Sequence, residues 1–386
     1  MRGHIAKKGK RYYVVIYEGI DPSTGKGRHR WHAAGPTRKG AERLLVELVK
    51  RHHDGEYRPP QKITLGEYLQ RWLPTQKARL AASTFSSYQR NIRLHVVPYI
   101  GSIPLQRLMP EDLDGLYAHL LDDGRRNQGG GALSPKTVRL VHSVIHKALA
   151  DAHRKGSVTR NVADVADAPT ISAGARPKMK AWKADELREF LELVEDHPLH
   201  TAFYVKANTG MRRGELLGLT WRAIDFDNAR LSVAQTVTAP DYKMVVSDVK
   251  SAHSLRTIDL NPRTVSILRT WRKQQLETYM QTGVRTDDSG FVFARPDGSP
   301  IHPDYFSQTF DRLLAKLDIP RIRLHDLRHT HATLLIKAGV PVKVVSERLG
   351  HASVAFTMQV YQHVLPGMQA DAAATFGEIV FGEARS

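Results

Sequence analysis

The stretch LGHASVAFTMQVYQHV (Leu349–Val364) decides how the C-terminal part of the chain is interpreted. Gly350 and His351 predict a turn, Ser353 can cap a helix, and Tyr361 follows ten residues after His351. A phenol has a pKa of about 10 in water, so a lone tyrosine is a poor nucleophile at neutral pH. Taken alone, the stretch favours a helical tyrosine that packs through its ring. A chemical role for Tyr361 requires cations from elsewhere in the chain.

The composition favours a nucleic-acid-binding protein with several domains. The chain has 386 residues, enough for two or three domains, and 41% of them are hydrophobic. Its 57 Lys and Arg against 39 Asp and Glu give a formal net charge of +18, which is typical of proteins that bind nucleic acid. On charge alone, a basic protein of the ribosomal type, or one that meets anionic membranes, is an alternative.

Cysteine content and hydropathy further limit which kinds of protein this chain can be. The chain contains no cysteine, which excludes disulfides, thiol nucleophiles and cysteine-based zinc sites. No apolar run reaches the length of a membrane span, and YYVVIY (Tyr12–Tyr17) is too short for a signal peptide. We therefore expect a soluble, intracellular protein.

The first 60 residues predict a small sheet with one helix and a basic face. They carry 14 Lys or Arg and 6 Asp or Glu. RYYVVIY (Arg11–Tyr17) predicts a strand, the segment Asp21–Gly27 a turn, and RHRWH (Arg28–His32) a strand with alternating basic residues. The apolar spacing of Ala41–His53 predicts a helix. Dense positive charge with interleaved aromatic residues favours DNA contact over a solvated hairpin.

A compact, basic, all-helical domain is expected at residues 63–166. The segments Gly55–Lys62 and Ala166–Trp182, which flank it, have the composition of linkers. One helix is expected to begin at Ser134 with Pro135 in its first position. The third domain then opens with helices, continues through a strand-rich section at Leu231–Leu260, and closes with helices.

An earlier helix of the all-helical domain lies in STFSSYQRNIRLHVVPYIG (Ser83–Gly101). We expect it to be capped by Ser83 or Thr84. We expect it to end at Pro98 and Gly101, since proline and glycine interrupt helices.

NTGMRRGELLGLTW (Asn208–Trp221) is the first stretch that can bind an anion. Gly210 precedes a predicted helix N-terminus, where free N–H groups and the helix dipole favour negative charge. Arg212 or Arg213 would lie in the first turn, and Glu215, three positions after Arg212, can brace its guanidinium. An ordinary surface pair of arginine and glutamate is the alternative.

RLHDLRHTHATLLIKAG (Arg323–Gly339) is the second such stretch. His325 shares a helical face with Arg328 and with His329. The spacing of the two histidines also suits a metal, although a third ligand is lacking in the neighbouring sequence. Guanidinium and imidazole groups on one face suit a phosphate better. Together the arginines, the histidines and Tyr361 favour phosphoryl transfer without a metal.

TGMRRGEL, HDLRHTHAT and LGHASVAFTMQVY, in this order and spacing, resemble the motifs of the tyrosine recombinases, and more narrowly those of phage-type or mobile-element integrases. The resemblance covers most of the chain and implies a multidomain fold that is mainly α with small β-sheets. It divides the chain into an arm-type DNA-binding domain, a helical core-binding domain of the SAM-like type, an α+β catalytic domain and a C-terminal tail, at residues 1–60, 63–166, 176–376 and 377–386.

The resemblance also implies roles for single residues. The first catalytic arginine, its supporting acid, the His-x-x-Arg pair, the next histidine position and the nucleophile correspond to Arg212, Glu215, His325, Arg328, His351 and Tyr361. His363 gains no role.

The family uses a further lysine on a β-hairpin between the first arginine and the His-x-x-Arg pair. SDVKSAHSLRTIDL (Ser247–Leu260) is similar to that hairpin, which makes Lys250 the candidate and Lys243 the second choice.

The implied reaction is DNA strand exchange. Tyr361 attacks a phosphodiester to form a 3′-phosphotyrosine, and Lys250 protonates the leaving 5′-oxygen. The two arginines and His351 hold the non-bridging oxygens, and His325 assists as a phosphate ligand or base. The 5′-hydroxyl of a partner strand then attacks the phosphotyrosine. Because the ester conserves the bond energy, no nucleotide or metal cofactor is required.

The implied partner is double-stranded DNA with attachment sites of core and arm type. Two rounds of strand exchange imply a homotetramer on DNA, in which the apolar tail Ala370–Gly382 would pack on a neighbouring subunit. The resemblance also brings in a host DNA-bending protein and an excision directionality factor. It implies a DNA-associated protein in the cytoplasm of a prokaryotic host, with no membrane partner.

Two alternatives follow from the same residues. A type IB topoisomerase-like enzyme would cleave and reseal DNA without exchanging partners, but the arm-like first domain argues against it. A non-catalytic DNA-binding regulator could use the same scaffold, but every expected catalytic position is filled.

Overall fold

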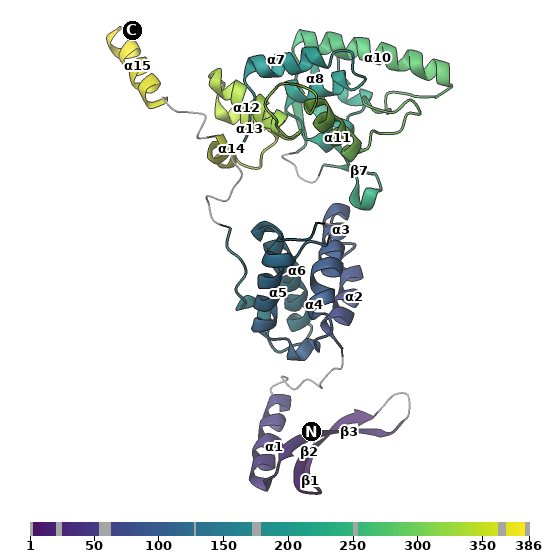
Figure 1. Ribbon diagram of the computed structural model, residues 1–386, viewed down its shortest axis with the longest axis vertical. Coiled ribbons are helices and arrows are strands. Elements are labelled where there is room, and N and C mark those ends of the chain that lie inside the picture. Colours follow the sequence, from purple (N-terminus) through teal and green to yellow (C-terminus); the bar gives the residue numbers. More distant parts are fainter. Residues whose placement is uncertain are drawn as a thin grey trace. The chain divides into compact units, whose positions relative to one another are not determined.

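The computed structural model describes residues 3–20, 25–53, 63–126, 129–171, 179–249, 254–361 and 368–382. The chain forms two compact units, Met1–Ala175 and Arg176–Ser386. Helices dominate both units, and the strands form small sheets (Figure 1), so the expected mainly α multidomain fold is confirmed. The linker expected at Gly55–Lys62 lies entirely outside the described residues.

The N-terminal part of the first unit is an antiparallel sheet packed against one helix. Its elements are β1 (Gly3–Lys8), β2 (Arg11–Ile20), β3 (Gly27–Gly35) and α1 (Arg38–His53), with β2 in the centre of the sheet. Val14 and Ile16 of β2 pack against Ala41 and Leu48 of α1 in a small core. Trp31 of β3 stays exposed. The expected strands and helix are confirmed, although most of the turn expected at Asp21–Gly27 is not described.

The rest of the first unit is helical. Its elements are α2 (Leu65–Thr75), α3 (Ala82–Asn91), the π-helical turn η1 (Ile92–Val96), α4 (Val97–Ile100), η2 (Leu105–Arg107), α5 (Pro110–Asp123), α6 (Pro135–Arg154) and η3 (Val162–Asp164). The Oγ of Ser134 accepts a hydrogen bond from the Thr137 N–H at 3.2 Å, which confirms the expected start of α6. Apolar residues of all the longer helices join one core.

The start expected for the helix in Ser83–Gly101 was wrong, whereas its expected end at Gly101 is confirmed, although Pro98 does not interrupt it. The helix begins at Ala82 after Ala81, without a side-chain cap from Ser83 or Thr84. Beyond Asn91 the chain continues through η1 into α4, with Pro98 in the first turn of α4. A first-turn proline loses no intrahelical hydrogen bond, and the wider π-turn lets the helix restart there.

The second unit surrounds two small sheets with helices. Its helices are α7 (Ala184–Leu193), α8 (His200–Thr209), α9 (Arg213–Leu217), η5 (Trp221–Ala223), η6 (Pro240–Tyr242), α10 (Pro262–Thr282), α11 (Pro303–Leu314), α12 (Asp326–Lys337), α13 (Val342–Leu349), α14 (Val354–Tyr361) and α15 (Met368–Phe381). Its strands are β4 (Ile224–Asp225), β5 (Arg230–Val233), β6 (Gln235–Thr238), β7 (Val245–Asp248) and β8 (Arg256–Asp259). Aromatic residues of α7, α8 and α11 fill the centre of the main core.

The strand pairing corrects the expected hairpin at Ser247–Leu260. The strand β7 pairs with β6, whereas β8 pairs with β5, so the two strands that flank the Lys250 position belong to different sheets. The hairpin of this region is β6–β7. Local alternation could not reveal this, because strand pairing is set by partners elsewhere in the sequence.

The helices α12, α13 and α14 pack together. The helix α12 lies against α8 and α13, and α13 contacts α14 (Figure 1). Ala332, Ile336, Val345, Leu349 and Tyr361 form a small core between them.

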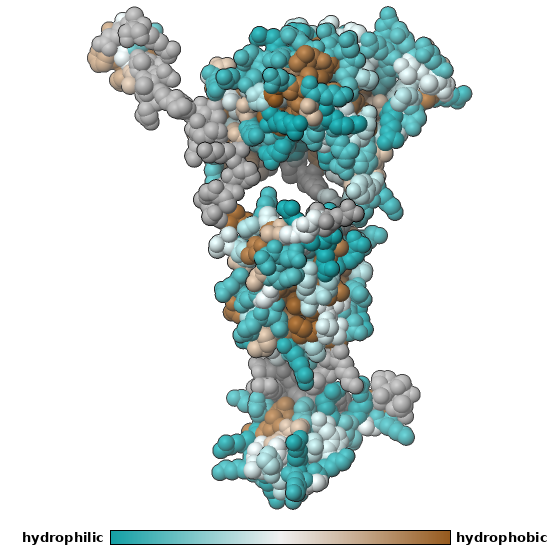
Figure 2. Space-filling view, viewed as in Figure 1, coloured by the Kyte–Doolittle hydropathy of each residue, from teal (hydrophilic) through white to brown (hydrophobic). Residues whose placement is uncertain are grey.

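The remaining features of the second unit are its surface and its C-terminal helix, α15. Hydrophilic residues cover most of the visible face of this unit (Figure 2). The expected domain boundary between residues 376 and 377 falls inside α15, which begins at Met368. None of the helices described is both long and apolar enough to cross a membrane.

Candidate active site

Gly210 sets the position of the loop that carries Arg212. It ends α8 in the left-handed conformation, with φ of +65°. A Cβ at this position would lie 2.7 Å from Leu349 Cδ2 and 2.8 Å from His331 Cδ2. Only glycine combines this backbone conformation with so close an approach. The loop is thereby pressed against α12 and α13.

Arg212 and Glu215 form a reciprocal cap at the start of α9. The Arg212 N–H donates to Glu215 Oε2 at 2.8 Å, and Arg212 Nη1 donates to Glu215 Oε1 at 2.7 Å. The predicted brace is therefore present. The N–H of Arg212, the residue before α9, is occupied by this carboxylate. The Arg212 side chain is 39% exposed, so its guanidinium can still meet a ligand.

Arg328 ties together the three sequence motifs. Its Nη1 donates to Gly210 O at 2.9 Å, and its Nη2 donates to Leu349 O at 2.7 Å. The residue is buried, and burial followed by the charge of Arg212 lowers its pKa to about 9. It therefore remains a cation at neutral pH. The sequence predicted that Arg328 and His325 share one face of a helix. The structure shows that Arg328 contacts Gly210 and Leu349 from α12.

Tyr361 ends α14 with its hydroxyl against a histidine. The Tyr361 Oη lies 2.9 Å from His329 Nδ1, and the residue is only 1% exposed. Burial raises the pKa of Tyr361 to about 12, although the charge of Arg328 opposes the shift. Sequence reasoning weighed His329 only as a metal ligand and missed this contact. The sequence indicated only that His329 lies four residues after His325, on the same face of the helix as the candidate site residues.

His325 and His351 are neutral imidazoles beside the arginines. His325 lies at the N-terminus of α12, and its ring is nearly perpendicular to that of His329, with 5.2 Å between the ring centroids. Loss of hydration within the site, then the charge of Lys206, lowers the pKa of His325 to about 4. His351 Nδ1 lies 2.7 Å from Thr357 Oγ1, and burial followed by the charge of Arg328 lowers its pKa to about 3.

The turn around His351 matches the sequence prediction. Gly350 has φ of +67°, and Ser353 Oγ accepts a hydrogen bond from the Phe356 N–H at 3.2 Å. Ser353 therefore caps α14, as expected.

Of the two candidate lysines, only Lys243 lies within the described residues. Lys250 lies outside the described residues, as does His363. Lys243 is exposed in the turn of the β6–β7 hairpin, and its N–H donates to Pro240 O at 3.0 Å. In the described part of the chain, no group of three or more His, Asp or Glu is arranged to hold a metal ion.

Lys206 is a buried lysine that sequence reasoning missed. Its Nζ donates to Met211 O at 2.9 Å, directly before Arg212. Burial, followed by the charge of Arg328, lowers the pKa of Lys206 to about 7. Its only sequence signal was a lysine within the apolar segment Ala202–Ala207.

Positive charge exceeds negative charge around the loop of Arg212. Arg212, Arg328, Arg256 and Lys206 interact electrostatically with the single carboxylate of Glu215 or with one another. Such a cluster favours an anionic ligand with several oxygens, such as a phosphodiester.

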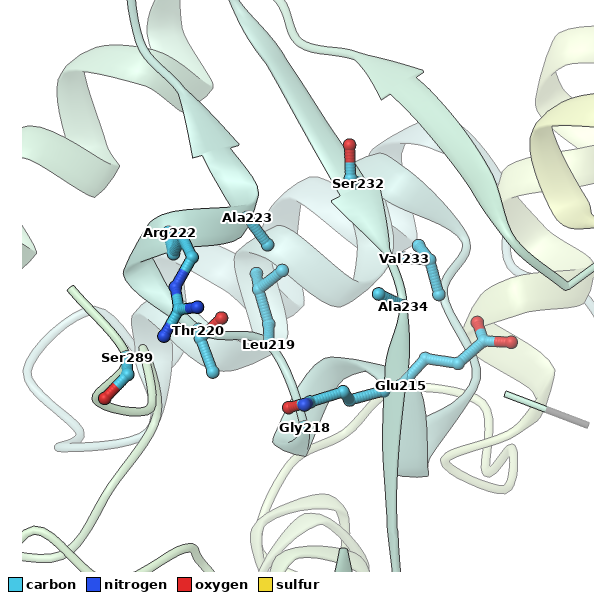
Figure 3. A pocket seen from close by; sticks show the side chains of 11 residues that line it. Glu215, Gly218, Leu219, Thr220, Arg222, Ala223, Ser232, Val233, Ala234 and Ser289 are labelled. Atoms are coloured by element: carbon cyan, nitrogen blue, oxygen red, sulfur yellow. The ribbon is translucent and has the colours of Figure 1, made fainter. Parts of the chain in front are cut away.

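A pocket of about 320 Å³ adjoins the buried carboxylate of Glu215. In Figure 3 this carboxylate points away from Arg222 and Ser289, which line the opposite end of the pocket. The described lining includes neither Arg212 nor Arg328. We therefore place the anion site at the arginines and not in this pocket.

Comparisons with known proteins agree with this geometry. Residues 180–367 match the model of the phage integrase family, and residues 64–121 match its N-terminal SAM-like domain. The chain is 28% identical to the ICEBs1 integrase of Bacillus subtilis (strain 168), over 96% of this chain and 98% of that protein. It is 27% identical to a XerC-like tyrosine recombinase of Caldanaerobacter subterraneus subsp. tengcongensis, over 97% of each.

Solved structures show the same fold. The Tn1549 transposon integrase, in complex with a circular intermediate DNA, aligns with a TM-score of 0.66 at 19% identity, over 81% of this chain and 99% of that one. A lambda integrase tetramer bound to a Holliday junction aligns with a TM-score of 0.54 at 18% identity, over 91% of this chain and 92% of that one. With its Arg212, Arg328 and Tyr361 motifs within the matched region, this chain belongs to the phage integrase family of tyrosine recombinases.

Proposed function

We propose that the chain recombines DNA at specific attachment sites through a 3′-phosphotyrosine at Tyr361, and so integrates and excises a mobile element. The observation that carries this proposal is the position of Arg328. It donates to Gly210 O and to Leu349 O, so one buried guanidinium joins the loop of Arg212 to the turn of His351. A tyrosine nucleophile needs such a cationic site, because the phosphorane that forms carries negative charge on its non-bridging oxygens.

Each side chain of the site then has a step to perform. Arg212, Arg328 and His351 bind the non-bridging oxygens, and Tyr361 Oη attacks phosphorus. His329 Nδ1 lies 2.9 Å from that hydroxyl, within hydrogen-bond distance, and can accept its proton. Burial lowers the pKa of His329, so the ring is neutral and able to accept a proton at pH 7.

The remaining steps complete the exchange. His325 assists as a phosphate ligand or a second base, and Lys250 protonates the 5′-oxygen that leaves. The 5′-hydroxyl of a partner strand then attacks the phosphotyrosine and releases Tyr361. No nucleotide or metal enters this scheme, because the phosphotyrosine ester keeps the bond energy.

The DNA partner and the assembly follow from the same proposal. We infer that residues 1–60 bind arm-type sites, that residues 63–166 bind core-type sites, and that four copies act together on DNA. The relatives support this, since solved lambda integrase structures include a dimer on a core site and a tetramer on a Holliday junction. An accessory bending protein and a directionality factor belong to the same proposal, as does a DNA-associated location in a prokaryotic cell.

The test is a nicked suicide substrate that traps covalent protein–DNA adducts. Wild-type protein should form an adduct, Tyr361→Phe should form none, and Tyr305→Phe should behave as wild type because Tyr305 is an exposed tyrosine of α11. An adduct in Tyr361→Phe would refute the nucleophile. A chain that binds attachment-site DNA but never forms an adduct would instead be a binding regulator.

A second measurement separates recombination from topoisomerase-like resealing. Two attachment-site DNAs should yield recombinant products. Relaxed plasmid without recombinants would favour the topoisomerase-like alternative.

A further inference from the structure

Arg256 is a buried arginine to which the sequence motifs gave no role. It is the first residue of β8, and its side chain is only 7% exposed. Its Nη2 donates to Glu215 Oε2 at 2.9 Å, its Nε donates to Arg348 O at 2.8 Å, and its Nη1 donates to Ser254 O at 3.2 Å. Each nitrogen of the guanidinium is therefore engaged inside the protein.

Three arginines converge on three consecutive carbonyls where α13 ends. Arg256 Nε donates to Arg348 O at 2.8 Å, Arg328 Nη2 to Leu349 O at 2.7 Å, and Arg212 Nη2 to Gly350 O at 3.0 Å. The last carbonyls of a helix lack intrahelical partners, and the helix dipole is negative at this end. The end of α13 therefore holds three like-charged groups together before any DNA is bound.

Glu215 links two of these arginines, Arg212 and Arg256, from the other side. Its Oε1 accepts from Arg212 Nη1 and its Oε2 accepts from Arg256 Nη2, at 2.7 and 2.9 Å. Burial alone would raise the pKa of Glu215, but the hydrogen bond and charge of Arg256, followed by the hydrogen bonds of Arg212, lower it to about 2. Arg212 is thus aligned by a carboxylate that Arg256 in turn holds in place.

We propose that Arg256 is a positioning residue for DNA cleavage, which holds Glu215 and the end of α13 so that Arg212 and Arg328 meet the scissile phosphate in one arrangement. The proposal rests on the proposed function of those two arginines. Arg256 does not contact DNA in this scheme, because all three nitrogens of its guanidinium donate to protein oxygens, whereas Arg212 and Arg328 do so through their two Nη atoms. Its effect reaches the phosphate through Glu215 and through the carbonyls of Arg348, Leu349 and Gly350.

The experiment compares Arg256→Gln and Arg256→Lys with wild type and with a matched control. The control is Arg230→Gln, which removes an arginine on the neighbouring strand β5 that pairs with Asp259 on the surface. DNA affinity, melting temperature and the single-turnover rate of adduct formation on the nicked substrate are measured for each.

We expect both Arg256 variants to bind DNA within about twofold of wild type, because Arg256 is not a DNA ligand. Cleavage should fall by roughly 10- to 100-fold in Arg256→Gln, as expected when a group acts only on the transition state. The cleavage rate of Arg256→Lys should lie between that of wild type and that of Arg256→Gln. An ammonium group can pair with Glu215 but cannot also reach Arg348 O. Arg230→Gln should cleave like wild type.

Two further readouts separate positioning from a merely structural role. Without Arg256 the pKa of Glu215 rises, so cleavage by Arg256→Gln should fall on acidification at a higher pH than cleavage by wild type. In a Glu215→Gln background, Arg256→Gln should cost much less than it does alone, because both act through one carboxylate. Additive losses, or an unchanged pH profile, would overturn the proposal.

The remaining outcomes distinguish this inference from the proposed function. If Arg256→Gln is folded and cleaves at the wild-type rate while Tyr361→Phe forms no adduct, only the role of Arg256 fails. If Tyr361→Phe still forms adducts, or Arg212→Ala forms them at the wild-type rate, the active-site assignment itself fails. If Arg256→Gln does not fold, Arg256→Lys decides, and a folded Lys variant with wild-type cleavage overturns the proposal.

Discussion

Arg212 and Arg328 are expected to share one chemical role, but their surroundings give them different structural costs. Arg212→Ala leaves one carbonyl, Gly350 O, without its donor, whereas Glu215 keeps its contact with Arg256, so stability should fall by about 1–3 kcal/mol. Arg328→Ala leaves Gly210 O and Leu349 O without their donor, at about 1–3 kcal/mol each. Both variants should lose most cleavage, but Arg328→Ala should unfold at the lower urea concentration, because it leaves two carbonyls without a donor and Arg212→Ala leaves one. Equal urea midpoints would contradict the buried clamp.

Lys206 gives the site a pH dependence that unfolding can measure. Its pKa is lowered from 10.5 to about 7 by burial, so between these values the unfolded chain binds more protons than the folded one. The shifted pKa of Lys206 therefore costs no stability above pH 10.5. The free energy of unfolding then decreases as pH falls toward 7, by on the order of a few kcal/mol. Urea unfolding at pH 7 and pH 9.5 should show a larger rise for wild type than for Lys206→Met. Parallel pH curves for the two proteins would refute the shifted lysine.

At the scale of elements, two left-handed glycines separate backbone strain from close packing. Gly210 ends α8 against Leu349 and His331, whereas a Cβ at Gly339, with φ of +81°, would meet nothing within 4 Å. Both alanine variants should lose about 1–2 kcal/mol from the left-handed conformation. Gly210→Ala should in addition displace the loop of Arg212 and reduce cleavage more than tenfold. Equal cleavage by the two variants would mean that the close approach of α8 and α13 does not position Arg212.

The elements also show how far sequence reasoning could reach. The caps at Ser134 and Ser353, and the pairing of Arg212 with Glu215, depend on neighbours within three residues and were predicted correctly. The contacts of Arg256 span 41 residues to Glu215 and 92 to Arg348, so no local spacing announces them. The hairpin at Ser247–Leu260 was wrong for the same reason, because the partners of its strands lie earlier in the chain. Local chemistry is readable from sequence, whereas the framework that aligns the site is a product of long-range packing.

For the whole molecule, the distribution of charge predicts that residues 1–60 and the rest of the chain bind different DNA sites. Residues 1–60 hold 14 Lys or Arg against 6 Asp or Glu, and Trp31 is exposed on β3. Binding that neutralises phosphates releases counterions, so the salt dependence of affinity counts the phosphates contacted. Deleting residues 1–60 should therefore weaken binding to arm-site DNA and flatten the slope of log affinity against log salt concentration. Core-site DNA is the control, and its salt slope and its adduct formation on the nicked substrate should persist, because the cluster around Arg328 lies in Arg176–Ser386. An unchanged slope on arm-site DNA would mean that the positive charge of the first 60 residues does not contact phosphate, and that the arm-type role is wrong.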